Sequence, residues 1–587
     1  MVTLLIVMCM GAAGDAAEES AWDVRSDTWE ATDALLRTLP GHEEVGPPRD
    51  RKVGIFYHTW HGVHGQSGPH DISKILAAHP EAYFETDHPA WGPMHAMHHW
   101  GESIFGYYVS DDEYVFRKHA EMLAHAGVDA IFFDATNQFT YKHEYMTLCK
   151  VFAQARKDGV KAPAIGFLCP FGDPARVVSE LYDDLYGPGL YKELWFQWKG
   201  KPLILADPAK VDPALHNFFT FRRPEPSYFV GPSGPDMWSW LEVYPQHVFE
   251  NSAGEPEQMS VGVAQNAVDD RLAAFSEPGS KGRSFHEGRT SDIPNAVRYG
   301  LNFAEQWDRA LEVDPQFVFV TGWNEWTAMR FTEFAGVELP VAFVDMFTQE
   351  KSRDIEPMKG GHGDDYYYQL ASYVRRYKGV RPQEPASAPA TIRIDGDFAD
   401  WDGVGPQFRA HPGSTVHRNH PGWGDAGVYV NETGRNDFIL AKVARDDANL
   451  YFYIETREPI TSPDDPMWMM LFLNADRNPR TGWNGYTHVL NRRSPASGDG
   501  AGLLRGALER SDGGWNWASI GEVAMAVDGA RMEVAIPRAL LGIESGPVDI
   551  EFKWADNIQR EDDPLEFTVS GDAAPPGRFN YRYFEGE

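Results

Sequence analysis

The sequence predicts an α/β fold, a (β/α)8 barrel of the TIM type, followed by an all-β sandwich domain. Two observations support this prediction. Through residues 50–380, short apolar runs typical of strands alternate with amphipathic runs typical of helices. After a linker rich in Pro, Ala and Ser at 381–390, short alternating runs separated by Asp, Asn, Gly and Pro continue through 391–587 with little helical pattern.

The barrel prediction tells us where a functional site should lie. In such barrels the side chains that act on a ligand come from the carboxyl ends of the strands. Helices are expected from Glu113 to Ala126 and in the stretch that ends at Gly159. The expected strands are Val53–Thr59, Val128–Phe133, Ala164–Leu168, Pro202–Leu205, Trp238–Tyr244, Met259–Gln265 and Phe317–Thr321.

Residues 1–17 have the pattern of a signal peptide, an apolar run followed by small residues that suit cleavage. No Lys or Arg precedes the apolar run, which departs from the usual pattern. We expect an exported protein, periplasmic or extracellular, in which residues 18–49 form an N-terminal extension. No later segment is apolar for the ~20 residues that a membrane span requires, so none is expected.

The composition excludes some partners. The formal net charge is −33, from 53 Lys and Arg against 86 Asp and Glu, so the chain as a whole repels the phosphates of nucleic acids. Aromatic residues make up 13% of the chain; most belong in cores, but some could stack on sugar rings. Whether Cys149 and Cys169 form a disulfide cannot be deduced from the sequence.

The stretch FVFVTGWNEW ends an expected strand with one carboxylate, Glu325, between two indoles. Desolvation among apolar side chains raises the pKa of a carboxyl group towards the range useful for acid or base catalysis. Asn324 could bond a ligand hydroxyl, and Trp323 and Trp326 could stack on a sugar ring. The structural alternative pairs Glu325 with Arg330 and places both indoles in the core.

A carboxylate that acts as acid or base on a saccharide ordinarily works with a second carboxyl group. Glu242 and Asp134 are the candidates. Glu242 lies in WSWLEVYPQ, where Tyr244 and two Trp surround it, and this aromatic setting repeats that of Glu325 and favours it narrowly. Asp134 directly follows the apolar run VDAIFF, and its structural alternative is a helix N-cap or an ion pair.

A histidine-rich segment follows the first expected strand. Tyr57, His58, Trp60 and His61 are interpreted as a rim that bonds and stacks on a sugar. Metal binding is the alternative, because imidazole is a common transition-metal ligand. No HExxH pattern or other spacing of known geometry is present, so no metal centre is expected.

GWNEW after a late strand, together with GIFYHTWHG after the first, resembles glycoside hydrolase family 99 and its relatives in bacterial polysaccharide clusters. The resemblance implies a (β/α)8 barrel that acts on α-mannosidic linkages, with Glu325 as the general base. The family continues Glu-Trp-His-Glu, where the second glutamate is the acid. This chain has Glu325-Trp326-Thr327-Ala328, so that acid is absent at the family's position.

The C-terminal region resembles carbohydrate-binding module family 9 in IRIDGDFADWDG, ARDDANLYFYIE and MMLFLNADRNPRTGWNGYTHVLN. The resemblance implies a β-sandwich attached to an extracellular carbohydrate-active enzyme. Asp476 and Asn478 could offer oxygen ligands to Ca²⁺, but a full ligand set is not evident.

Together these observations predict an exported glycoside hydrolase with a polysaccharide or oligosaccharide substrate, Glu325 as base or nucleophile and a second rim carboxylate as acid. The alternative is a glycan-binding protein whose barrel has lost catalysis.

Overall fold

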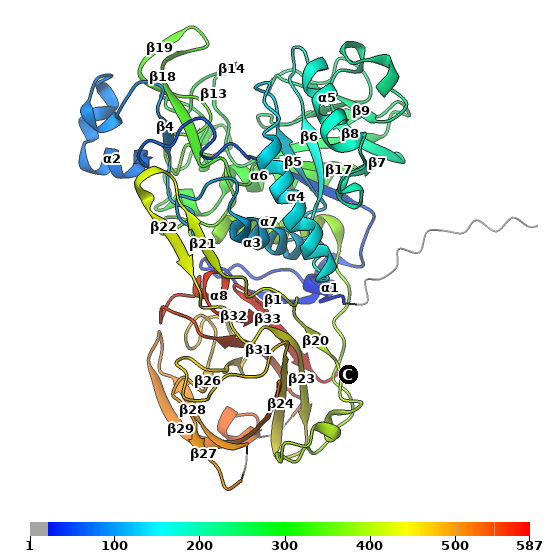
Figure 1. The fold of residues 1–587 in the computed structure, drawn as a ribbon, viewed down its shortest axis with the longest axis vertical. Coiled ribbons are helices and arrows are strands. Elements are labelled where there is room, and N and C mark those ends of the chain that lie inside the picture. Colours follow the sequence, from blue (N-terminus) through cyan, green and yellow to red (C-terminus); the bar gives the residue numbers. More distant parts are fainter. Residues whose placement is uncertain (1–21, 501, 545, 587) are drawn as a thin grey trace, which may run out of the picture.

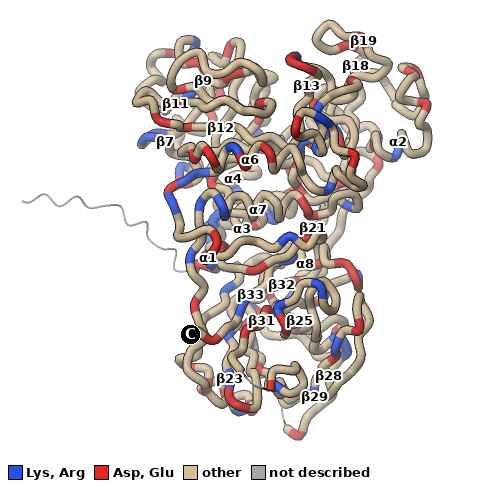
Figure 2. The backbone as a smooth tube through the Cα atoms, turned by 180° about the vertical axis from the view of Figure 1, so that it is seen from behind, with Lys and Arg blue, Asp and Glu red and all other residues tan. Residues whose placement is uncertain are grey.

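The computed structural model describes residues 22–500, 502–544 and 546–586. It contains a barrel-shaped parallel sheet and a large antiparallel sheet (Figure 1). The expected signal peptide, residues 1–17, lies outside the described residues. None of the described helices combines the length and apolar character that a membrane span needs. Asp and Glu occur along the backbone of both regions, interspersed with Lys and Arg (Figure 2).

The first region is built on a ten-stranded sheet. Among the described residues, eight of its strands run parallel and follow chain order around the barrel, with the last strand, β17, beside the first, β2. Short antiparallel strands β7 (Gln197–Trp198) and β11 (Phe249–Glu250) join this set. The eight are β2 (Lys52–Tyr57), β5 (Ala130–Asp134), β6 (Ala164–Leu168), β8 (Lys201–Leu205), β9 (Thr220–Glu225), β10 (Met237–Ser239), β12 (Pro256–Gly262) and β17 (Phe317–Thr321).

The parallel sheet nearly closes into a barrel. At its two ends, β10 and β12 are joined by the side chain of Gln258, which is fully buried. The backbone N–H of Ser239 donates to Oε1 of Gln258 at 2.9 Å, and Nε2 of Gln258 donates to the carbonyl of Ser239 at 2.9 Å. One amide side chain therefore bridges the strands where a closed barrel would have a backbone ladder.

Helices cover only part of the barrel. α3 illustrates why they form where they do: the Asp112 carboxylate caps its first turn by accepting from the N–H of Tyr114, and Gly127, at φ 78°, follows its end. Loops and short 3-10 turns replace α-helices between β8 and β12, so a regular (β/α)8 alternation is present in part. The barrel helices are α3 (Glu113–His125), α4 (Lys142–Lys157), α5 (Ala175–Leu181), α6 (Leu301–Val313) and α7 (Asp365–Lys378).

Two excursions build the mouth of the barrel. After β2 the chain forms β3 (His70–Asp71), α2 (Ile72–Ala78) and β4 (Met97–His99). After β17 it forms the hairpin of β18 (Thr327–Phe334) and β19 (Val337–Phe343), and β18 pairs with β4. The segment that follows Glu325 is thus held against the segment that follows His58.

The second region is a thirteen-stranded antiparallel sheet, consistent with the expected sandwich. The short strand β1 (Glu30–Ala31) pairs with the last strand, so the chain ahead of the barrel also reaches this sheet. Its strand order is β1, β33 (Phe579–Phe584), β31 (Asp549–Asp556), β25 (Met470–Asn474), β26 (His488–Leu490), β28 (Leu503–Ser511), β29 (Trp517–Asp528), β30 (Arg531–Pro537), β24 (Asn449–Thr456), β23 (Phe438–Arg445) and β20 (Phe408–Arg409), with β27 (Ala496–Ser497) and β32 (Asp572–Ala574) to the side.

A hairpin from the second region packs against the barrel (Figure 1). Its strands are β21 (Arg418–Pro421) and β22 (Val428–Asn431). Arg418 forms an ion pair of 2.7 Å with Asp112, the residue that caps α3. The Tyr429 hydroxyl accepts from the N–H of Tyr107 at 2.9 Å.

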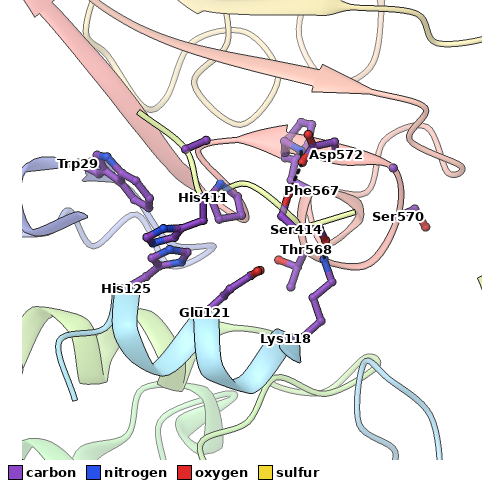
Figure 3. Close-up of a pocket in the computed structure, with 14 residues that line it drawn as sticks. Trp29, Lys118, Glu121, His125, His411, Ser414, Phe567, Thr568, Ser570 and Asp572 are labelled. Atoms are coloured by element: carbon purple, nitrogen blue, oxygen red, sulfur yellow. Dashed lines mark hydrogen bonds between the residues drawn. The ribbon is translucent and has the colours of Figure 1, made fainter. Parts of the chain in front are cut away.

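The two regions also meet at a small pocket beside α3 (Figure 3). There the rings of His125 and His411 stack with centroids 5.3 Å apart and planes 8° apart. Burial lowers the pKa of each imidazole to about 3, so both are neutral at physiological pH.

Candidate functional site

Glu325 reaches the mouth of the barrel because the chain turns sharply after β17. The N–H of Gly322 donates to the carbonyl of Arg353, and the N–H of Trp323 donates to the carbonyl of Phe56 in the neighbouring strand β2, each at 2.9 Å. These bonds carry the chain across the carboxyl end of β2. Glu325 consequently faces His58, the first residue after β2.

The Glu325 carboxylate is buried between the Arg353 guanidinium and the His58 imidazole, and only 3% of the residue is exposed. Its Oε1 lies 3.2 Å from Nε2 of His58, and its Oε2 lies 2.9 Å from Nη2 of Arg353. Burial alone would raise the pKa of Glu325, but the charges of Arg353 and then His58 outweigh it and lower that pKa. Glu325 is therefore ionised at neutral pH.

The pKa of His58 is shifted in the opposite direction to that of Glu325. Burial acts to lower the pKa of its imidazole, but the Glu325 carboxylate more than offsets this and raises it. Asp134 adds to the same effect. His58 and Glu325 thus stabilise each other's charged forms.

A second carboxyl group, Asp345, shares Arg353 with Glu325. Nη2 of Arg353 lies 3.0 Å from Oδ1 of Asp345 and 2.9 Å from Oε2 of Glu325, so these two oxygens are no more than about 6 Å apart. The Asp345 side chain is 32% exposed, in contrast to Glu325. Burial and then the charge of Glu325 raise the pKa of Asp345 to about 6.

This pair of carboxyl groups has unequal proton affinities. Glu325 holds a negative charge while Asp345 retains a proton to a higher pH. Two neighbouring carboxyl groups whose environments push their pKa values apart are suited to divide acid and base roles between them.

Arg353 is held in place by several contacts. Its Nη1 donates to Oδ1 of Asn266 at 3.2 Å, and its guanidinium lies 5.6 Å from the ring centroid of Trp240. The residue is 1% exposed. The positive charge is fixed behind the carboxyl pair and cannot swing into solvent.

The other residues of the GWNEW stretch bond to and pack against neighbouring residues of the chain. Asn324 accepts from the N–H of His58 at 2.9 Å and donates to the carbonyl of His58 at 3.1 Å. Trp323 is fully buried, and Trp326 stacks on Trp100 with ring centroids 4.6 Å apart. These contacts position Glu325, while the expected roles of Trp323, Asn324 and Trp326 in ligand binding stay predictions.

A buried carboxylate, Glu356, holds this loop from behind. Its oxygens accept from Trp326 Nε1 at 2.6 Å, from the Tyr108 hydroxyl at 2.7 Å and from the Ser103 hydroxyl, and the residue is fully buried. Nε2 of His119 lies 3.2 Å from the same carboxylate.

Arg330, the partner considered in the structural alternative, donates instead to the carbonyls of Thr86 and Gly92.

The rim residues differ in exposure. Tyr57 is fully buried and bonds His119 through its hydroxyl at 2.7 Å, and His61 bonds the Ser110 hydroxyl at 2.8 Å. Trp60 is partly exposed, and its ring stacks on His58 with centroids 5.8 Å apart. Trp60 is thus the member of this group that lies nearest to solvent.

Glu242, one of the two expected acids, has its own partner. β10 ends at Ser239, so the strand expected to reach Tyr244 is shorter and Glu242 lies in the following loop. The Glu242 carboxylate accepts from the N–H of His247 at 2.8 Å and lies 3.0 Å from that residue's Nδ1. Burial raises the pKa of Glu242 to about 9. Tyr244 is 46% exposed.

Asp134 acts on the same histidine as Glu325, because its charge also raises the pKa of His58. One of its oxygens, Oδ1, accepts from the N–H and hydroxyl of Thr136 at 2.9 and 2.7 Å. These bonds form a local turn and not the helix N-cap of the structural alternative, because the next helix, α4, begins at Lys142. Within the described residues, no hydrogen bond or ion pair joins Glu325 to either Asp134 or Glu242.

Cys149 and Cys169 are both buried and both free.

The loop expected to offer oxygen ligands to Ca²⁺ is held by its own hydrogen bonds. Oδ1 of Asp476 accepts from the N–H of Asn478 and the hydroxyl of Thr481, each at 3.0 Å. Calcium binding there stays a prediction.

No protein-family model and no curated protein matches the sequence. Among solved structures, the GH99 endo-alpha-mannosidase from Bacteroides thetaiotaomicron is similar, with a TM-score of 0.32 and 16% identity over 57% of this chain and 100% of that chain. Its complex with BIS-TRIS-propane gives 0.31 and 15% over 56% and 98%. A glycoside hydrolase-like protein gives 0.30 and 12% over 56% and 95%. These likenesses are distant, so the site must be interpreted from its own geometry.

Proposed function

We propose that the chain is a glycoside hydrolase acting on a polysaccharide or oligosaccharide, with Glu325 as base or nucleophile and Asp345 as general acid. The observation that carries this proposal is the pair of carboxyl groups joined by Arg353, one ionised and buried, the other protonated to near pH 6 and partly exposed. Asp345 takes the acid role that sequence reasoning gave to Glu242 or Asp134.

The proposed division of work follows from charge. The Asp345 carboxyl donates its proton to the glycosidic oxygen as the bond from that oxygen to the anomeric carbon breaks. Glu325, which Arg353 and His58 keep ionised, either attacks the anomeric carbon itself or takes a proton from a hydroxyl group that attacks that carbon. The fixed charge of Arg353 stabilises the ionised form of Glu325 until it reacts.

Unpaired polar atoms near the site support a ligand rich in hydroxyl groups. Within the part of the chain that the structure describes, the buried atoms Nδ1 of His58, Oγ1 of Thr59, and Nε1 of Trp60 and Trp240 have no hydrogen-bond partner. Buried polar atoms are normally satisfied, and sugar hydroxyls can both donate and accept. The exposed ring of Tyr244 would extend the stacking surface.

The same proposal includes export and a role for the second region. The N-terminal pattern suits a secreted protein, and a sandwich similar to family 9 modules would hold the enzyme close to its polysaccharide. The interface formed by Arg418 and Asp112 would couple the two regions.

A binding protein without catalysis is the second candidate. The 3% exposure of Glu325 and its pairing with Arg353 and His58 favour it, because a nucleophile must reach its substrate. Ala328, where the resembling family has its acid, points the same way.

Reducing-end release from a panel of mannans, other neutral glycans and anionic polysaccharides separates the two functions. Binding to the same panel is measured in parallel by affinity electrophoresis. A hydrolase releases reducing ends from at least one glycan that it binds. Binding to a glycan with no release after long incubation would replace the hydrolase with the glycan-binding protein.

A further inference from the structure

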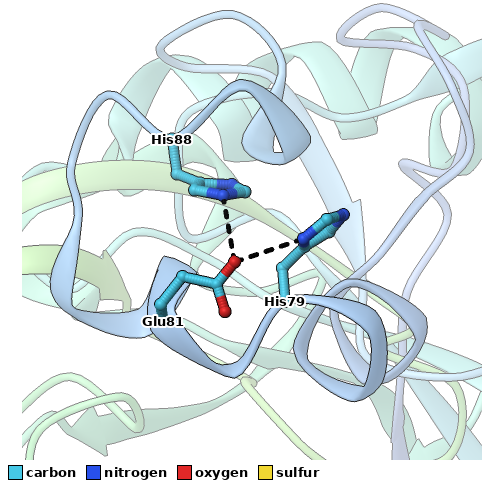
Figure 4. Close-up of side chains that lie close together, drawn as sticks. All are labelled: His79, Glu81 and His88. Carbon is cyan, nitrogen blue, oxygen red and sulfur yellow. Dashed lines mark hydrogen bonds and ion pairs between the residues drawn. The ribbon is translucent and has the colours of Figure 1, made fainter.

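The excursion between α2 and the short helix at Pro89–Trp91 brings three metal-ligating side chains together (Figure 4). Oε1 of Glu81 lies 3.3 Å from Nδ1 of His79 and 3.5 Å from Nε2 of His88. One ligand atom from each residue lies within 4.8 Å of the others. The group lies outside the candidate catalytic site and its chemistry is not used there.

The two contacts of Glu81 fit a tetrahedral ion, whereas the two imidazoles, whose ligand atoms lie within 4.8 Å of each other, would adjust on binding. With bonds of about 2.0–2.1 Å, two ligands of a tetrahedral Zn²⁺ are about 3.3–3.4 Å apart, close to both contacts of Glu81. Two imidazole nitrogens and one carboxylate oxygen suit zinc or a similar transition metal, whereas Ca²⁺ and Mg²⁺ prefer oxygen ligands alone. We propose that His79, Glu81 and His88 form a surface site for a divalent transition-metal ion such as Zn²⁺.

The backbone prepares the site before any ion binds. At the end of α2, the N–H of His79 donates to the carbonyl of Ile75 over 2.8 Å. Pro80 starts the next helical turn. His88 begins the short helix at Pro89–Trp91. Because all three ligands lie near helix ends within one short stretch, little chain entropy remains to be lost on binding.

The surroundings attract cations and leave room for a fourth ligand. The segment HPEAYFETDH, residues 79–88, contains Glu85 and Asp87 in addition to Glu81, and no Lys or Arg. The side chains of His79 and Glu81 are 49% and 54% exposed. Water can therefore complete the coordination.

One existing contact must change. Nδ1 of His88 accepts from the N–H of Ala90 at 3.3 Å, so the ring proton is on Nε2. An ion at Nε2 places that proton on Nδ1 and removes this long hydrogen bond. Ala90 is partly exposed, so water can accept from its N–H instead.

A bound ion would brace the wall of the barrel mouth. Tyr83, between the ligands, donates to the carbonyl of Ser276 at 2.8 Å, and its ring lies 5.7 Å from that of Phe347. Phe347 follows Asp345 by two positions. The carbonyl of Thr86 accepts from Arg330 of β18. The ion would thus restrain a segment that contacts both β18 and the stretch just beyond β19.

Isothermal titration of the chelator-treated full chain with ZnCl₂ tests the site. We expect one ion per chain and a rise in melting temperature on addition of Zn²⁺, with no response to CaCl₂. His79→Ala, Glu81→Gln and His88→Ala should each weaken Zn²⁺ binding by more than about tenfold and remove most of the temperature rise. The side chains of His79 and Glu81 are about half exposed, so their metal-free variants should melt as the metal-free wild type does. The His88 side chain is only 15% exposed, so its variant should melt somewhat lower without metal.

His143→Ala is the matched control. His143 is 72% exposed and lies 3.7 Å from Asp111, whose other carboxylate oxygen lies 3.5 Å from His420. Among the described residues, this group does not bring three ligand atoms within 4.8 Å of one another. This variant should bind Zn²⁺ as the wild type does. The site is overturned if the wild type takes up no Zn²⁺, or if its uptake survives unchanged in the three ligand variants. Neither result depends on glycan cleavage.

Discussion

Nη2 of Arg353 lies 2.9 Å from Oε2 of Glu325, in a pair that is almost entirely excluded from solvent. A buried carboxylate without such a partner would hold its proton at neutral pH. Arg353 therefore decides the charge of Glu325, although the two residues are separated by the whole β18–β19 hairpin. Asp345 contacts the same nitrogen, so the charge of Glu325 also acts on the pKa of Asp345.

Replacing Arg353 by Met should damage both stability and activity. It leaves a buried carboxylate without its strongest partner, so we expect the free energy of unfolding to fall by about 3–5 kcal/mol. The pKa of Glu325 should rise, because burial then acts against fewer opposing charges. The pH below which hydrolysis declines should consequently move upwards, as measured in a rate-against-pH profile.

Arg353→Lys is the matched control, since it keeps the charge and loses the planar geometry. It should move the acidic limb of the profile less than Arg353→Met does. Equal profiles for the wild type and Arg353→Met would show that Arg353 does not control Glu325.

Asp345→Asn should remove the general acid. With a pKa of about 6, the carboxyl of Asp345 loses its proton as the pH rises, so wild-type activity should decline above about pH 6. In Asp345→Asn this alkaline limb should disappear, and kcat on natural glycans should fall by about 10²–10⁴-fold. Aryl glycosides with acidic phenols should lose much less, because their leaving groups need no proton.

Glu338→Gln controls for the loss of a nearby carboxylate, since Glu338 is exposed on β19. It should leave the profile unchanged. If Asp345→Asn lost activity equally on good and poor leaving groups, Asp345 would not be the acid, and Asp134 would be the next candidate.

The stacked pair His125 and His411 should make the protein sensitive to acid. Unfolded histidine takes up a proton near pH 6.5, whereas each folded ring resists protonation until about pH 3. The unfolded state therefore binds more protons between these values, and stability is lost as the pH falls through this window. Each histidine should account for about 2 kcal/mol lost between pH 7 and pH 5.

His411→Phe keeps a ring in the stack and removes one titrating group. Its urea unfolding midpoint should drop less than that of the wild type between pH 7 and pH 5. The comparison must be between variant and wild type, because Asp572 in the same pocket has a pKa raised to about 7 and acts in the opposite direction. An equal drop in both proteins would contradict the assignment.

Much of the barrel could be predicted from the sequence, because its central strands are continuous apolar runs of the right length. Ala164–Leu168 and Phe317–Thr321 form with the expected bounds. β9 (Thr220–Glu225) was missed because its sequence, TFRRPE, looks polar. Arg222 of that strand is buried in an ion pair with Glu257 at the core of the barrel, a compensation that no local pattern reveals.

The candidate site could be predicted only in part. A carboxylate between two indoles after an apolar strand drew attention to Glu325, and the end of β2 to His58. Arg353 and Asp345 were missed because they lie in an irregular segment beyond β19, where no periodicity applies. The apolar strand β19 ends two residues before Asp345, and this was the one local signal that could have indicated it.

The most direct test of the proposed function is the rate of reducing-end release by Glu325→Gln and wild type on whichever glycan the wild type cleaves. The amide keeps the shape of the side chain and removes its charge. The proposal predicts a loss of at least about 10²-fold, with glycan binding retained and Glu338→Gln unaffected. A Glu325→Gln variant that is folded and cleaves the glycan at the wild-type rate would contradict it.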